Sequence, residues 1–120
     1  VGYTAERFIW VHTQAEPDRD IHLEIARRGA WIEYDSIGSE DPDDDTYVEL
    51  VRHALEAGLG DHVLLSHDRG WFDPAQPNGG APSAFTYITD VFLPKLRGVG
   101  VDDIALRQLT QVNPFRAFAR

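Results

Sequence analysis

Two apolar segments of the chain end in side chains that bind metals. Residues 8–11 run into His12, and residues 63–68 end on Asp68. Imidazole and carboxylate groups are the usual ligands of Zn²⁺ where cysteine is missing, and the sequence contains no cysteine. A metal held by such groups activates water near neutral pH, with a nearby carboxylate as proton acceptor. His12 and Asp68 are therefore candidate ligands of a divalent metal, with zinc as the expected ion.

A serine-dependent mechanism is one alternative, because Ser66, His67 and Asp68 carry the side-chain types of a catalytic triad. Consecutive residues in a strand point to opposite faces, so these three cannot act on one another. The glycine-rich nucleophile and phosphate-binding motifs are missing as well. A second alternative stays open. Two ligands are fewer than the three that catalytic zinc usually takes, and both groups could be ordinary strand-end residues.

Strands are expected at the apolar segments that carry these residues. The predicted strands are residues 8–12, 30–35 and 63–68, and the continuous apolar runs of the first and third predict buried strands. They end in His12, Asp35 and Asp68, respectively. Helical segments separate the strands, which implies parallel pairing, because parallel neighbours need a crossover connection. The strand ends should then lie on one edge of the sheet, where the groups of the first and third strand could converge on one ion or substrate.

The helices are predicted from apolar spacing and from capping residues. They cover about ten residues after Asp18 or Asp20, residues 46–57, residues 84–97, residues 102–109 with Asp102 as cap, and a terminal segment capped by Asn113. The spacing puts Ile21 and Phe85 on buried helix faces. Pro94 is expected to kink its helix or to tighten the last turn.

Two loops stand out by charge or length. Residues 36–45 are dense in acids without the EF-hand spacing, which favours a solvated loop and a negative helix start over a calcium site. Residues 69–82 are rich in glycine and proline, and loops of this length often serve as lids or binding loops. Trp71 and Phe72, near its start, are candidates for the wall of a pocket.

The composition excludes several classes of partner. The formal net charge is −9 at pH 7, which argues against nucleic acid and anionic membranes, since both need basic clusters. No apolar run reaches the roughly 18 residues of a membrane span. With 120 residues, 42% of them hydrophobic, the chain has the composition of one soluble domain. The lack of cysteine fits the cytoplasm, which is the expected location.

Several motifs resemble one known family. They are RFIWVH at 7–12, RRGAWIEYD at 27–35, VLLSHD at 63–68, FLPKLR at 92–97, GVGV at 98–101 and VNP at 112–114. Together they resemble the last three strands and the closing helices of the phosphotriesterase family. This family includes the phosphotriesterase-like lactonases and lies within the amidohydrolase superfamily. The similarity covers nearly the whole chain.

The resemblance implies a (β/α)₈ TIM barrel with two divalent metals, commonly zinc, at the carboxyl ends of its strands. His12 resembles the sixth-strand histidine that binds the more exposed metal. Asp68 resembles the eighth-strand aspartate that binds the buried metal and acts in catalysis by shuttling protons. Asp35, Arg69 and Trp71 fall where the family is expected to contact its substrate.

Part of the family pattern is missing from this sequence. The first-strand His-x-His, the carboxylated lysine and the fifth-strand histidine have no counterpart, and Lys95, the only lysine, falls in a predicted helix. Ser36 stands where the family often has histidine or arginine after the aspartate. The sequence starts at Val1 and contains no methionine, so we expect a processed, trimmed or excerpted chain.

A complete barrel needs about 250 residues. Residues 1–120 are therefore expected to form a single partial domain of class α/β, the last three βα units of the barrel. Its open sheet edges would need the rest of the barrel, or a self-association partner, to cover them.

Two hypotheses about function follow. In the first, the chain is part of a binuclear hydrolase that attacks a small lactone or phosphotriester with metal-bound hydroxide, and the isolated chain is inactive. In the second, it is a small non-catalytic α/β binding or interaction module in which His12 and Asp68 are incidental.

Overall fold

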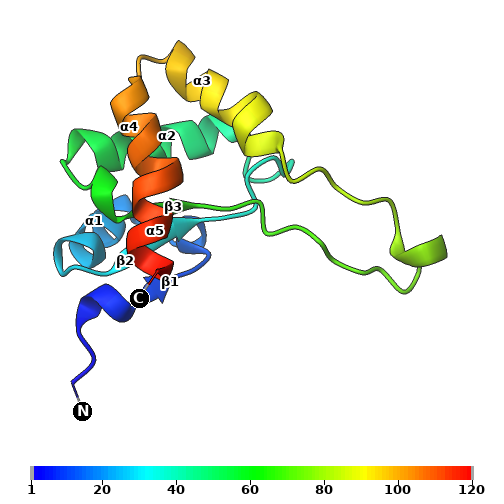
Figure 1. The fold of residues 1–120 in the computed structure, drawn as a ribbon, viewed down its shortest axis with the longest axis horizontal. Coiled ribbons are helices and arrows are strands. Elements are labelled where there is room, and N and C mark those ends of the chain that lie inside the picture. Colours follow the sequence, from blue (N-terminus) through cyan, green and yellow to red (C-terminus); the bar gives the residue numbers. More distant parts are fainter. Residues whose placement is uncertain (1, 120) are drawn as a thin grey trace.

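The computed structural model describes residues 2–119, which form a short sheet with helices packed against it (Figure 1). The strands are β1 (Ile9–Trp10), β2 (Trp31–Tyr34) and β3 (Val63–Leu65). The α-helices are α1 (Arg19–Arg27), α2 (Asp44–Glu56), α3 (Leu93–Gly98), α4 (Asp103–Arg107) and α5 (Asn113–Phe118). The remaining elements are the 3₁₀ turns η1 (Ala5–Arg7), η2 (Thr13–Ala15), η3 (Gly60–His62) and η4 (Pro77–Gly79), and the π-helical turns η5 (Ile88–Phe92) and η6 (Gln108–Val112). None of the helices within residues 2–119 is long and apolar enough to cross a membrane.

The sheet is parallel, as the alternation of strands and helices predicts. Its order is β1-β2-β3, with Ile9 opposite Trp31 and Tyr34 opposite Leu65. The helix α1 connects β1 to β2, and α2 connects β2 to β3. The predicted strands are therefore confirmed in position and direction, although each is shorter than predicted.

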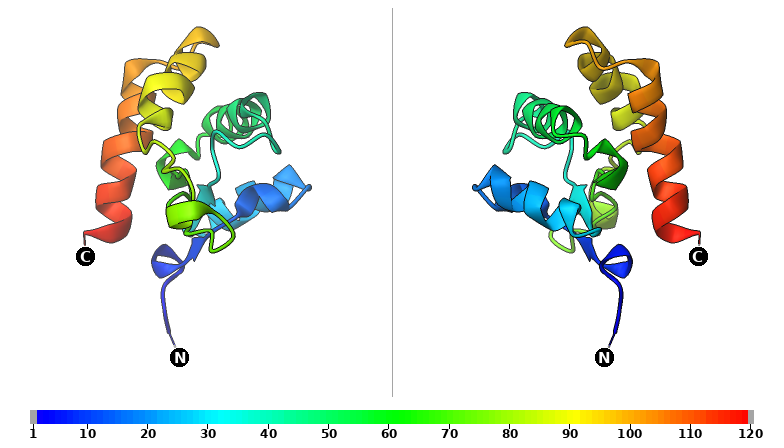
Figure 2. Two further views of the ribbon diagram at one scale, coloured as in Figure 1. Left: turned by 90° about the vertical axis from the view of Figure 1, so that its right-hand side faces the viewer. Right: turned by 90° about the vertical axis from the view of Figure 1, so that its left-hand side faces the viewer.

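The core lies between the strands and the helices that flank them. In Figure 2, α2 and the α4–α5 segment lie on opposite sides of the strands. The strands contribute Ile32, Tyr34 and Val63, none of them more than 1% exposed. The helices contribute Leu23, Ala26, Tyr47, Val51, Phe92, Leu96 and Leu109, among others. Burial of these side chains is the main favourable contribution to folding, and it holds the strand ends at fixed positions.

The strand β1 differs most from its prediction, which was a buried strand over residues 8–12. Only Ile9 and Trp10 pair with β2, and the flanking Phe8 and Val11 are 56% and 49% exposed. An edge strand has a neighbour on one side only, and within residues 2–119 no other strand pairs with β1. The prediction of a buried strand is therefore wrong for the described chain. Among the described residues, β3 at the opposite edge also lacks a second neighbouring strand.

The helix α1 is rotated relative to its prediction. Asp18 caps it as predicted, by accepting a hydrogen bond from the amide of Asp20. Its buried residues are His22, Leu23 and Ala26, whereas Ile21 is 37% exposed. Ile21 was expected on the buried face. The helix turns His22 rather than Ile21 toward the core, because the His22 ring finds hydrogen-bond partners there.

Each of the two prolines late in the chain follows a π-helical turn. Pro94 follows η5, where the amide of Leu93 donates to the carbonyl of Ile88. Pro114 follows η6 in the same way. A proline lacks the amide of a normal helical bond and crowds the preceding turn, and the wider turn accommodates this. The prediction of a distorted helix at Pro94 is correct, but the turn widens rather than tightens.

Two predictions about helix starts are wrong. Phe85 is 66% exposed, because the helical conformation starts at Tyr87 and Phe85 belongs to the preceding turn. Asn113 has helical dihedral angles instead of those of a cap, and its buried amide donates to the carbonyls of Gly60 and Val63 at 2.8 and 2.7 Å. It therefore fastens the terminal helix to the start of β3.

His22 should make the stability of the fold depend on pH. Its Nε2 lies 2.9 Å from the carbonyl of Glu16, and its Nδ1 lies 3.2 Å from the Tyr34 hydroxyl. Burial lowers the pKa of His22 below 6.5 and outweighs the opposing effect of Glu16, while the charges of Arg19 and His53 make smaller contributions that also lower it. Well above pH 6.5 the imidazole is neutral in both the folded and the unfolded state. As pH falls through about 6.5, the unfolded chain takes up the proton more readily, so the free energy of unfolding decreases.

We therefore expect the drop in thermal stability between pH 8 and pH 5 to be smaller in His22→Gln than in the wild type. Tyr34→Phe is the matched control, because it removes a bonding partner but leaves the buried imidazole in place. Scanning calorimetry at several pH values measures the difference. An equal drop in His22→Gln and wild type would contradict the prediction.

Candidate metal centre

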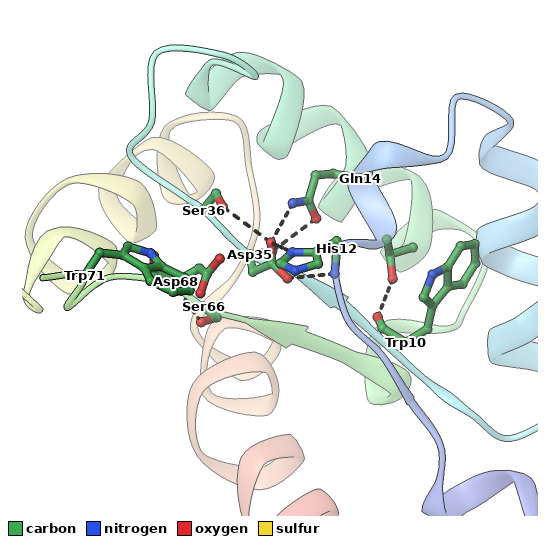
Figure 3. A network of polar contacts seen from close by, with 9 residues as sticks. Trp10, His12, Gln14, Asp35, Ser36, Ser66, Asp68 and Trp71 are labelled. Atoms are coloured by element: carbon green, nitrogen blue, oxygen red, sulfur yellow. Dashed lines mark hydrogen bonds and ion pairs between the residues drawn. The ribbon is translucent and has the colours of Figure 1, made fainter. Parts of the chain in front are cut away.

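Three side chains that bind metals meet at the carboxyl edge of the sheet. Ligand atoms of His12, Asp35 and Asp68 all lie within 4.8 Å of one another (Figure 3). They follow β1, β2 and β3, which are parallel neighbours. The sequence predicts that His12 and Asp68 converge, and the structure places them together. It adds Asp35 between them, because β2 is the central strand.

The backbone turns sharply at each of these strand ends. His12, Ser36 and Asp68 have φ angles of 55°, 62° and 47°. The left-handed region costs a non-glycine residue about 1–2 kcal/mol. Such residues persist only where the surrounding structure fixes them, and they cluster at functional sites. Three at the end of three adjacent strands support a functional site at this edge.

Asp35 is the buried centre of the cluster. Its side chain is 3% exposed, whereas that of His12 is 59% exposed. The Asp35 carboxylate accepts a bond from the His12 amide at 2.7 Å and from Gln14 Nε2 at 2.6 Å. It also lies 2.8 Å from His12 Nδ1. Because a carboxylate only accepts hydrogen bonds, His12 Nδ1 carries the proton, and Nε2 is left with the lone pair that can bind a metal.

The carboxylate of Asp35 shifts the pKa values of two nearby side chains. The hydrogen bond to Asp35, followed by the charge of that carboxylate, raises the pKa of His12 above 6.5. Glu33, two residues before Asp35 on β2, is half-buried. Burial raises the pKa of Glu33, and repulsion from Asp35 raises it further. The strand end therefore concentrates negative charge where a cation would be favoured.

Asp68 is held mainly through its backbone. Its amide donates to Ser66 Oγ at 3.2 Å, and its carbonyl accepts from Trp71 Nε1 at 2.9 Å. Within residues 2–119, its carboxylate makes no hydrogen bond to protein. Both oxygens of the Asp68 carboxylate are therefore available for a ligand.

Arg69 and Trp71, predicted to contact substrate, lie at the start of the loop after β3. The guanidinium of Arg69 donates to the carbonyls of Ala84 and Gly38. Trp71 is 78% exposed and lines a hollow of about 410 Å³ within the loop, together with Phe72 and Phe85. These positions suit Trp71 to a pocket wall, while the substrate contacts of Asp35, Arg69 and Trp71 stay predictions.

Two residues have roles at the site that their sequence positions do not predict. Gln14 exchanges hydrogen bonds with Asp35, since its Oε1 also accepts from the Asp35 amide at 3.2 Å. Ser66 caps the amide of Asp68. The only signal for Gln14 is its position two residues after His12, and this acquires meaning once the turn after β1 is known.

The donor set fits a divalent metal. His12 Nε2 and the Asp68 carboxylate are the types of ligand that zinc prefers. Asp35 is already engaged by His12 and Gln14, which matches the outer carboxylate that commonly orients a metal-binding histidine. The described residues would hold part of a metal shell, with Asp35 fixing the orientation of His12.

Comparisons with known proteins relate the whole described chain to one group of proteins. The sequence model described as "Phosphotriesterase family" matches residues 2–118. A phosphotriesterase homology protein from Escherichia coli K12 is 29% identical over 118 residues, which cover 98% of this chain and 40% of that protein. A human N-acetyltaurine hydrolase is 28% identical over 108 residues, covering 81% of this chain and 30% of the relative.

A solved structure matches the fold closely. The phosphotriesterase from Mycobacterium tuberculosis superposes with a TM-score of 0.85 at 27% identity, covering 99% of this chain and 39% of that chain. The predicted fold class, three βα units of a TIM barrel, is thereby confirmed. The chain spans only 30 to 40% of the length of the two curated relatives described.

The contact between His12 and Asp35 can be tested directly. In Asp35→Asn we expect the pKa of His12 to fall toward 6.5, because the variant removes the charge that favours the imidazolium. Ser36→Ala is the matched control, since its hydroxyl lies 3.5 Å from the same carboxylate and contributes no charge. Titration of the imidazole by NMR gives the pKa. An unchanged value in Asp35→Asn would mean that the two side chains do not interact in solution.

Proposed function

Because this chain belongs to the phosphotriesterase family, we propose that it forms part of a metal-dependent hydrolase. The complete barrel would hold two divalent metals, with zinc as the expected ion, and would cleave a small lactone or phosphotriester. The observation that carries the proposal is the convergence of His12, Asp35 and Asp68 at the carboxyl edge of the sheet, where TIM-barrel enzymes place their active sites.

The side chains would have different roles in such a site. His12 and Asp68 would hold metal, through Nε2 and the carboxylate. A divalent metal, when bound, supplies the Lewis acidity that makes water nucleophilic near neutral pH. Asp35 keeps the His12 ring in one tautomer and orientation. Asp68, whose carboxylate has no bond to protein in residues 2–119, would accept a proton from the attacking water.

The substrate would lie between this edge and the loop after β3. The exposed ring of Trp71 and the hollow of about 410 Å³ beside it supply an apolar wall, which suits the apolar part of an ester or lactone. Asp35 and Arg69 are the other substrate contacts that the family resemblance proposes, and in this structure their charged groups bond to His12 and Gln14 and to the carbonyls of Ala84 and Gly38, respectively. The similarity to N-acetyltaurine hydrolases adds N-acetyltaurine to the compounds that a substrate screen should include.

The rest of a barrel, or a second copy of the chain, is the proposed partner of the open sheet edges. β1 and β3 each have an unpaired side within the described residues. Exposed aromatic and apolar residues beside β1, Phe8 and Val11, support a covering segment there.

The metal proposal predicts that the full-length protein retains divalent metal and that Asp68→Asn loses it. The variant should also reduce hydrolysis by more than ~100-fold, since even changes next to metal ligands cost about 10–100-fold. Asp20→Asn, at an exposed aspartate in the first turn of α1, is the matched control and should behave like the wild type. Elemental analysis and a hydrolysis assay over lactones, phosphotriesters and N-acetyltaurine measure both effects. Absence of metal, with no effect of Asp68→Asn, would favour a non-catalytic binding module.

A second prediction concerns the isolated 120-residue chain. We expect it to show almost no hydrolysis with added zinc, because the described residues provide fewer ligands than a binuclear shell requires. The same assay measures it, with the full-length protein as the reference. Zinc-dependent turnover by the isolated chain at about 1 s⁻¹ or faster, the range of ordinary enzymes, would refute this prediction.

A further inference from the structure

The loop after β3 returns to the sheet beside Asp68. Most of residues 69–86 extends away from the helices, as the green-to-yellow segment on the right of Figure 1. The two residues that flank Asp68 in the sequence both bind where the chain returns: Arg69 binds Ala84 at the end of the loop, and His67 binds Ile88 at the start of η5. The base of the loop is therefore closed at the position of the candidate metal ligand.

Arg69 makes three contacts at this base. Nη1 donates to the carbonyl of Ala84 at 2.6 Å, and Nη2 donates to the carbonyl of Gly38 at 3.3 Å. The guanidinium carbon lies 5.1 Å from the centre of the Tyr87 ring. A planar fork of donors above an aromatic face is an arrangement that arginine provides and lysine does not. One side chain thus joins both ends of the loop to the segment after β2.

Gly38 leaves the space that this arrangement needs. A Cβ atom on Gly38 would lie 2.6 Å from Arg69 Nη2 and 2.7 Å from the Tyr87 ring. Its φ of +89° is also a conformation that favours glycine. The backbone after β2 is therefore shaped to receive the guanidinium.

The contacts continue into two helices. The His67 Nε2 accepts a bond from the amide of Ile88 at 2.9 Å, at the start of η5. The Tyr87 hydroxyl donates to Asp44 Oδ2 at 2.8 Å, and Lys95 Nζ donates to the same oxygen at 2.8 Å. Asp44 is buried in α2 and Lys95 belongs to α3. The loop base is thereby fastened to the packed part of the molecule.

Asp68 needs such support. It has a φ of 47°, a strained conformation that persists only where its surroundings impose it. We propose that Arg69 is a positioning residue for Asp68, which clamps the base of the loop and so fixes the direction of the carboxylate. This inference rests on the proposed role of Asp68 as a metal ligand.

The test compares Arg69→Gln with Arg97→Gln in the full-length protein. Arg97 also donates two bonds, to the exposed Asp103 outside the loop, so the control removes a similar fork elsewhere. Chymotrypsin cleavage after Trp71, Phe72 and Phe85, which are 78%, 74% and 66% exposed, reports opening of the loop. Isothermal titration with zinc reports the metal site.

Arg69→Gln should be cleaved about tenfold faster and bind zinc about tenfold more weakly, as expected from the loss of bonds made by a charged group. Arg97→Gln should match the wild type in both, and Arg69→Lys, which keeps the charge above Tyr87, should recover part of each effect. Unchanged zinc affinity in Arg69→Gln, with or without faster cleavage, would overturn the proposal. A wild-type protein that binds no zinc would instead refute the proposed function, and the cleavage rates would still decide whether Arg69 clamps the loop.

Discussion

The buried carboxylate of Asp35 is the group on which the geometry of the candidate metal centre depends. A buried carboxylate is costly unless donors surround it. Here the donors come from the turn after β1: the amide and ring of His12 and the side chain of Gln14. The hydrogen bonds to the Asp35 carboxylate therefore fix the position of this turn against β2. The orientation of His12, which is itself mostly exposed, is a consequence of that requirement.

The two proposed metal ligands are held in different ways. His12 is oriented through its own ring, by a carboxylate from the neighbouring strand. Asp68 is oriented through its backbone and through the loop that follows it. The first arrangement leaves one ring nitrogen for a metal, and the second leaves a whole carboxylate. Both depend on the same core, because packing of α1, α2 and α3 against the strands fixes where the strand ends lie.

Much of this arrangement can be predicted from the sequence, because it follows from short-range rules. Strand–helix alternation gives the parallel order, and Asp18 and Asp102 cap helices as their residue types suggest. Features that depend on tertiary contacts cannot be predicted in this way. His22 turns into the core because Tyr34 and Glu16 supply partners there, and Asn113 lies inside a helix because its amide satisfies two carbonyls near β3. No local sequence pattern predicts which groups will serve as these hydrogen-bond partners.

The open edges of the sheet bear on how a complete site would form. Parallel strands bring their carboxyl ends to one edge, and this rule brings His12, Asp35 and Asp68 together. Further strands paired with β1 and β3 would bring their own ends to the same edge. Those strand ends would supply the metal ligands that the described residues lack. Pairing of further strands with the open sheet edges would therefore also complete the metal shell. A chain whose sheet edges stay open would have an incomplete metal site.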